Sequence, residues 1–137
     1  MKMPDNLSTI LVAPCGMNCL VCAAYLRKKK SCLGCRGPNE SIPLHCRNCK
    51  IKACAMEQSL NLCYECSTFP CTRLKRLDKN YQQRYHVSLI ENARYLQNVG
   101  SDQYLHEEHE KWRCVACGSV VCLHDRVCSE CGKFMPE

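Results

Sequence analysis

The sequence predicts a small metal-stabilised α+β protein, with an irregular cysteine-rich N-terminal region of zinc knuckles, three short helices and a C-terminal zinc ribbon. The first observation is that 16 of the 137 residues are cysteine, roughly 12%, where more than about 8–10% in a short chain marks a cross-linked scaffold. The second is that the cysteines form two blocks, residues 15–71 and 114–131, separated by a stretch without any. The third is the helical spacing of apolar residues in that stretch.

Metal ions are the expected cross-links. Aromatic residues make up only 7% of the chain, and small domains with thin cores usually need disulfides or metals. The apolar stretch 7–13 is followed by no cleavage-site pattern, so we expect a short buried strand there and not a signal peptide. The expected location is therefore cytoplasmic, where disulfides are rare and clustered cysteines indicate metal ligands. No apolar run approaches the roughly 18–20 residues of a spanning helix, so no membrane is expected as a partner.

Composition divides the chain into three regions. Residues 1–71 form a cysteine-rich multi-metal region, residues 72–112 a helical segment that packs on it, and residues 113–137 the zinc ribbon. The first expected helix has Thr68 as its N-cap, Pro70 in its first turn and a stripe of four apolar residues. That stripe consists of Leu74, Leu77, Tyr81 and Tyr85.

Two further helices are expected before the second cysteine block. One begins at the capping-box pattern of residues 88–91 and ends at Gly100. The other is capped by Ser101 or Asp102, and it carries one apolar stripe: Leu105, His109 and Trp112. His106 and His109 could form a ligand pair, but the acidic residues beside them indicate a solvated helix face instead. Those acidic residues are Glu107, Glu108 and Glu110.

The C-terminal block contains the most specific motif. Two C-x2-C-G units, Cys114-x2-Cys117-Gly118 and Cys128-x2-Cys131-Gly132, are separated by ten residues. Two such turns present four thiolates to one ion, with Zn–S near roughly 2.3 Å, and a closed Cys₄ site is structural because it has no open position. A single iron is the chief rival for this cage. Cys122 and His124 lie between the units and are possible extra ligands.

The N-terminal block offers more ligands than one site needs. Its members are Cys15, Cys19, Cys22, Cys32, Cys35, Cys46, Cys49, Cys54, Cys63, Cys66 and Cys71. The four C-x2-C pairs among them would make two closed Cys₄ sites: Cys19/Cys22, Cys32/Cys35, Cys46/Cys49 and Cys63/Cys66. Cys15, Cys54 and Cys71 remain as a third group, completed by His45 or Cys122, or left open to water or a substrate. The closed form is favoured.

An internal repeat lies within this block. The spacing of Cys46, Cys49 and Cys54 recurs seventeen residues later in Cys63, Cys66 and Cys71. A pair of equivalent knuckles would explain it. About four zinc ions per chain are expected in total, and a [4Fe–4S] cluster within residues 15–71 is the alternative cofactor, because both kinds of centre take four cysteines.

Charge gives little support to a nucleic-acid partner. The formal net charge is +6, but a Cys₄ zinc site carries −2, so four sites would bring the total to about −2. The aromatic residues that could stack on single strands are better explained by helix packing. A protein partner is therefore preferred to nucleic acid, and no small-molecule substrate is indicated.

Four segments of the chain are distinctive: CGMNCLVCAAY, CLGC, CRNCKIKACAMEQSLNLCYECSTFPC and YHVSLIENARYLQNVG. Together they resemble the uncharacterised cysteine-rich family catalogued as domain of unknown function 3795. The resemblance is best over residues 13–75. It implies a small bacterial or archaeal protein that is presumed to bind metal, and it implies no reaction or substrate.

The sequence thus predicts a zinc-binding protein with several structural sites, acting as a non-enzymatic scaffold or interaction module. No catalytic residue is assigned, since no acid–base pair, nucleophile set or phosphate loop is present in the pattern. The alternatives are an iron–sulfur redox or sulfur-handling protein with a cluster in residues 15–71, a nucleic-acid-binding zinc protein, and an enzyme working at an open third site.

Overall fold

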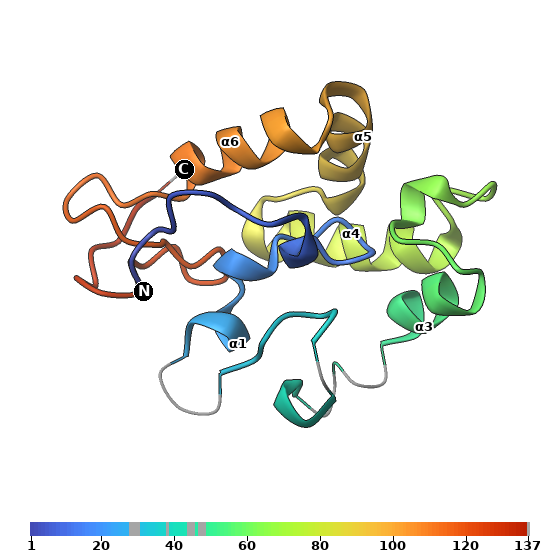
Figure 1. Cartoon of the computed structure of the whole chain (residues 1–137), viewed down its shortest axis with the longest axis horizontal. Coiled ribbons are helices and arrows are strands. Elements are labelled where there is room, and N and C mark those ends of the chain that lie inside the picture. The colour runs from blue at the N-terminus through green and yellow to red at the C-terminus, as the bar shows by residue number, and fades with distance from the viewer. Residues whose placement is uncertain (28–30, 38, 44–45, 47–48, 137) are drawn as a thin grey trace.

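A computed structural model describes residues 1–27, 31–37, 39–43, 46 and 49–136, and this part of the chain is mostly helical. Three helices fill the cysteine-free stretch: α4 (Thr72–Tyr85), α5 (Leu89–Val99) and α6 (Ser101–Lys111). Helix α5 packs against both α4 and α6, and α4 runs through the middle of the molecule (Figure 1). The three predicted helices are confirmed.

The cysteine-rich region folds into short elements around this helical unit. They are the 3₁₀ turns η1 (Thr9–Leu11), η2 (Cys19–Val21), η3 (Asn39–Ser41) and η4 (Cys63–Glu65), and the helices α1 (Ala23–Leu26) and α3 (Lys50–Glu57). Extended pairing among the described residues is limited to isolated bridges. The coarse prediction of a small cysteine-rich fold therefore holds, whereas the described chain contains much less β structure than an α+β fold implies.

The strand expected at residues 7–13 is a wrong prediction. The chain forms the η1 turn there, because the Ser8 hydroxyl accepts a hydrogen bond from the Ile10 N–H at 3.3 Å and starts the turn. Ile10 is 58% exposed, so the apolar pattern does not correspond to a buried strand. Only Val12 pairs, with Asn18, in a single antiparallel bridge.

The helix ends show which cap predictions are sound. Ser88 caps α5 by accepting from the Glu91 N–H at 3.1 Å, and Gly100 ends that helix, both as predicted. Gly100, with φ of 86°, is also the N-cap of α6, so neither predicted cap of that helix is used. Cys71, not Thr68, is the N-cap of α4. The local sequence pattern therefore locates all three helices, but it does not give the residue at which α4 and α6 begin.

One apolar core connects both cysteine blocks with the helices. Its main cluster draws buried residues from 13–21, 87–89 and 112–128. Leu20 and Val120 are 0% exposed, and the Leu123 N–H donates to the Val21 carbonyl at 2.9 Å. The N-terminal segment also lies beside the C-terminal loops, with Lys2 bridged to Ser119 (Figure 1).

Gly16 sets how closely the first cysteine loop approaches α5. Its φ is 97°, and a Cβ at this position would lie 2.8 Å from the carbonyl oxygen of Leu89. Both the left-handed backbone and the contact require glycine. The loop that carries Cys15 and Cys19 is therefore seated directly on the start of α5.

The sequence predicts Glu108 on a solvated helix face, and this prediction is wrong. The side chain is buried, and its carboxylate accepts hydrogen bonds from the Asn18 amide at 3.4 Å, the Tyr104 hydroxyl at 3.4 Å and the Trp112 indole N–H at 3.3 Å. Tyr104 and Trp112 lie four residues on either side of Glu108, so the three share one face of α6. Of its neighbours, His106 is exposed and His109 is half-buried, bonded to Glu110 at 3.3 Å.

We expect Glu108 to make the stability of the protein depend on pH. Burial raises the pKa of Glu108 above its ordinary value of 4.5, so the folded state binds the proton more tightly than the unfolded chain. The carboxylate therefore costs stability progressively as the pH rises from 4.5 through the folded pKa. For each pH unit in that interval, the free energy of unfolding falls by about 1.4 kcal/mol. The Glu108→Gln variant lacks this titration.

The measurement is the free energy of unfolding of both proteins by denaturant at several pH values. The wild type is expected to lose stability relative to Glu108→Gln as the pH rises. All other titrations, including those of the thiols, occur in both proteins and cancel in the difference. A difference that stays constant with pH would contradict the prediction.

Candidate metal centre

Four cysteines of the C-terminal block converge on one point. The Sγ atoms of Cys114 and Cys131 are 3.7 Å apart, those of Cys117 and Cys128 are 3.5 Å apart, and all four lie within 4.8 Å of one another. Four sulfurs around one ion at about 2.3 Å would be about 3.8 Å apart along the edges of a tetrahedron. The thiols present therefore fit a single tetrahedral ion such as Zn²⁺.

Two turns of matching geometry position these thiols. In the first, the Ala116 N–H donates to the Cys114 sulfur at 3.4 Å, and Gly118 follows with a φ of 78°. In the second, the Glu130 N–H donates to the Cys128 sulfur at 3.5 Å, and Gly132 has a φ of 74°. Glycine tolerates this left-handed backbone, which brings the chain back past the sulfurs. The backbone N–H groups stabilise negative charge on the sulfurs that they contact.

The acidity of two thiols favours metal binding. Hydrogen bonds from Ser119 lower the pKa of Cys117 to about 6. The backbone N–H of Cys117 lowers the pKa of Cys114. Because the thiolate is the form that binds metal, a lowered pKa reduces the cost of proton release on binding.

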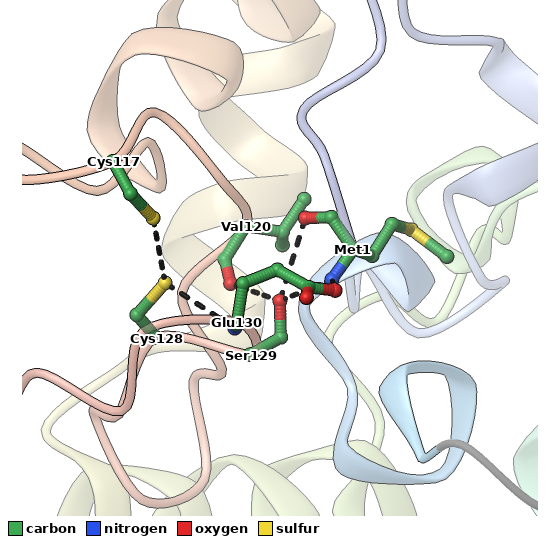
Figure 2. A network of polar contacts seen from close by, with 6 residues as sticks. All are labelled: Met1, Cys117, Val120, Cys128, Ser129 and Glu130. Atoms are coloured by element: carbon green, nitrogen blue, oxygen red, sulfur yellow. Dashed lines mark hydrogen bonds and ion pairs between the residues drawn. The ribbon is translucent and has the colours of Figure 1, made fainter.

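The second turn is anchored to the first residue of the chain (Figure 2). The Val120 N–H donates to the Met1 carbonyl at 2.8 Å, and the Ser129 hydroxyl donates to the Val120 carbonyl at 2.7 Å. The amino group of Met1 donates to the Ser129 hydroxyl at 2.8 Å and pairs with the Glu130 carboxylate. Residues 129–130, between two of the four cysteines, are thereby held in place from outside the turn.

Two of the possible extra ligands lie apart from the four thiols. His124 accepts a hydrogen bond from the Ala23 N–H on Nδ1 at 3.1 Å and bonds the Tyr81 hydroxyl through Nε2 at 3.4 Å. Both ring nitrogens are thus engaged with groups of the other cysteine block and α4. Cys122 is buried, and burial raises its pKa. The third residue, His45, lies outside the described residues.

In the first part of the N-terminal block, backbone N–H groups contact two of the sulfurs, and its described ligand atoms form no set of three or more within 4.8 Å. The Cys19 sulfur accepts from the Cys35 N–H at 3.3 Å, and the Gly34 N–H donates to the Cys32 sulfur at 3.4 Å. Burial raises the pKa of Cys15 to about 12. Arg36 binds the carbonyls of Val12 and Asn61 and fixes this loop to its neighbours.

The second part of the block surrounds a cavity of about 420 Å³ between α3, η4 and the start of α4. Four cysteines line it: Cys54, Cys63, Cys66 and Cys71. The sequence predicts Cys54 and Cys71 in a group with Cys15, whereas the structure places them beside Cys63 and Cys66. Over the ranges the structure describes, no set of three or more ligand atoms other than the C-terminal four lies within 4.8 Å.

The seventeen-residue repeat does not produce two equivalent knuckles. Cys54 lies inside α3, whereas its counterpart Cys71 lies before α4 as the N-cap. Cys49 is the N-cap of α3, but Cys66 ends the η4 turn. Cysteines from both copies of the repeat instead line one cavity. The repeated spacing in the sequence is the signal that could have suggested this meeting of the two copies.

These features define a small cysteine-rich protein with a Cys₄ group suited to a metal ion. Residues 11–76 match the model of a family described as a protein of unknown function, DUF3795, which confirms the resemblance seen in the cysteine pattern. No curated protein and no solved structure matches the chain. In the described part, no helix is both long and apolar enough to cross a membrane.

Proposed function

We propose that this protein is a non-enzymatic zinc protein whose several cysteine-ligated sites are structural. The observation that carries the proposal is the C-terminal Cys₄ group, whose sulfurs already stand at nearly the spacing of a tetrahedral zinc site. Four thiolates leave no open position for water or substrate, which is the mark of a structural site. The bridges Arg113↔Val120 and Val121↔Cys128 support a ribbon-like form of this region.

The cysteines of residues 1–71 are proposed as ligands of further sites, with about four metal ions per chain in all. Residues 72–112 would be the helical segment that packs on this region, and residues 113–137 the ribbon. Metal binding would supply the folding energy that a small apolar core cannot supply alone.

A protein is the proposed partner. Two large apolar side chains stand out near the four thiols, Val115 at 79% and Phe134 at 60% exposed. Val115 lies between Cys114 and Cys117, and Phe134 follows the Cys131-Gly132 turn. Exposed apolar side chains on a rigid metal-fixed loop are suited to contact with another protein.

The test is the metal content of two matched cysteine variants, purified without oxygen. Cys117→Ser removes one ligand of the C-terminal group at an exposed position, so we expect about one zinc fewer per chain than in the wild type. Cys122→Ser changes a neighbouring cysteine outside the group and is expected to keep the full zinc content. Unchanged zinc in Cys117→Ser, or a wild-type protein that contains no zinc, would overturn the zinc assignment.

A further inference from the structure

We propose that the cavity between α3, η4 and the start of α4 holds a [4Fe–4S] cluster, bound by Cys54, Cys63, Cys66 and Cys71. This assigns a cluster to four of the cysteines left without a specific site above, and it does not depend on the C-terminal zinc site, because the two sites share no residue. Three features support the assignment: the size of the cavity, the spacing of its sulfurs and the groups that surround them.

The cavity is far larger than one ion needs. Its volume of about 420 Å³ is many times the roughly 10–15 Å³ that a cavity needs to hold one water molecule. The cysteines come from three different elements: Cys54 from α3, Cys63 and Cys66 from the two ends of η4, and Cys71 from the N-cap of α4. They therefore surround the space from several sides.

The spacing of the sulfurs separates this cavity from the C-terminal site. At the C-terminal site all four sulfurs lie within 4.8 Å of one another, whereas no three of the cavity sulfurs do. A single zinc ion needs sulfurs about 3.8 Å apart. In a [4Fe–4S] cluster each cysteine binds a different iron, and the whole cluster lies between the four thiolates. The sulfurs of the four cysteines are therefore farther apart than those around a single zinc ion.

The walls suit a large, soft and negatively charged centre. Apolar side chains line much of the cavity: Ile51, Ala55, Leu60, Phe69 and Leu74. The first turn of α4 lines the cavity, and its N-cap, Cys71, makes no side-chain capping hydrogen bond, so the positive end of the helix dipole lies beside the cavity. A cluster with four thiolates is anionic, and a helix N-terminus stabilises negative charge.

Polar side chains also contact the ligand sulfurs. The Gln58 amide donates to the Cys54 sulfur at 3.0 Å, and its oxygen lies 3.6 Å from the Cys66 sulfur. The Thr68 hydroxyl lies 3.1 Å from the Cys66 sulfur. Hydrogen bonds to ligand sulfurs tune the reduction potential of iron–sulfur clusters. Gln58 is thus a positioning residue at this site, and it acts through its hydrogen bond to the Cys54 sulfur.

The test starts from the full chain purified without oxygen and then reconstituted with sulfide and equal amounts of ferrous and ferric iron, which together match the mixed-valence iron of a [4Fe–4S]²⁺ cluster. We expect about four iron and four sulfide per chain and a brown colour. Cys66→Ser should lose most of the iron and sulfide but keep its zinc. Cys117→Ser should lose zinc but keep the cluster, so the zinc proposal and the cluster proposal can each fail without the other. Cys122→Ser changes a cysteine outside both sites, so it is the matched control and should keep the cluster.

A second variant retains all four ligands and so avoids loss of folding. Gln58→Ala is expected to keep the wild-type iron content but to lower the reduction potential of the cluster, because the reduced, more negative state loses a hydrogen bond. Three outcomes would overturn the proposal. They are zinc and no iron at the cavity cysteines, a cluster lost in Cys122→Ser but kept in Cys66→Ser, and a reconstituted protein that binds neither iron nor sulfide.

Discussion

Removing the bound metal from the reduced protein with a strong chelator is expected to unfold it outright. Structural zinc contributes about 10–16 kcal/mol of apparent folding free energy in zinc-finger peptides. A whole domain is stable by only about 5–15 kcal/mol. Loss of metal from all of the proposed sites together therefore removes more stability than the whole protein has. The effect should exceed that of any single substitution in the core.

The structure explains why the helices should not survive this treatment. Helices α4, α5 and α6 have 14, 11 and 11 residues, and isolated helices shorter than about 12–15 residues are marginal in water. Their packing partners in the main core come from residues 13–21 and 112–128, the two segments that carry metal-ligand candidates. When those segments are released, the helices lose the surface against which they pack.

Circular dichroism and tryptophan fluorescence during chelation would measure this. We expect the helical signal and the buried-tryptophan emission to be lost together. The matched control is the same chelator already saturated with zinc, which should change neither signal. An apo protein with an unchanged circular dichroism spectrum would show that metal does not hold the core.

Trp112→Ala is expected to cost about 3–5 kcal/mol of unfolding free energy, the usual cost of removing a large buried aromatic side chain. Trp112 is 3% exposed in the main core and directly precedes the first C-terminal turn. Its indole N–H is a donor to the buried Glu108 carboxylate, and the Arg126 guanidinium lies 5.0 Å from the ring. The substitution leaves a void and also removes one hydrogen bond from a buried acid.

Denaturant unfolding followed by circular dichroism would measure the loss, with bound metal held constant. Phe134→Ala is the matched control, since it truncates an aromatic side chain that is 60% exposed. It should change stability by no more than about 0.5 kcal/mol. Equal costs for the two variants would mean that Trp112 does not belong to the core.

The sequence predicts best those features of the fold that depend on interactions between residues close together in the chain. Helix α5 has a serine N-cap and a glycine stop within its own sequence, and both function as predicted. The two C-x2-C-G units likewise contain, within a few residues, the turns that aim their thiols. These features depend on neighbours in the chain, so the pattern alone is enough.

Features that the sequence does not predict depend on residues far apart in the chain. Glu108 is expected to be solvated from its own helix, because its partner Asn18 lies 90 positions away. The grouping of Cys54 with Cys63 is missed because it depends on how α3 is placed against η4. Similarly, the position of His124 between two cysteine pairs suggests a metal ligand, whereas both of its ring nitrogens are bonded to Ala23 and Tyr81.

The shared core has a consequence for how the protein is made. Residues 13–21 pack against residues 112–128, so the first cysteine loop leaves the ribosome roughly 90 residues before its partner. At about 5–20 residues per second, that delay is roughly 5–20 s. During this time the early thiols are open to any metal or oxidant nearby. Correct loading therefore depends on which metals the cell supplies during those seconds.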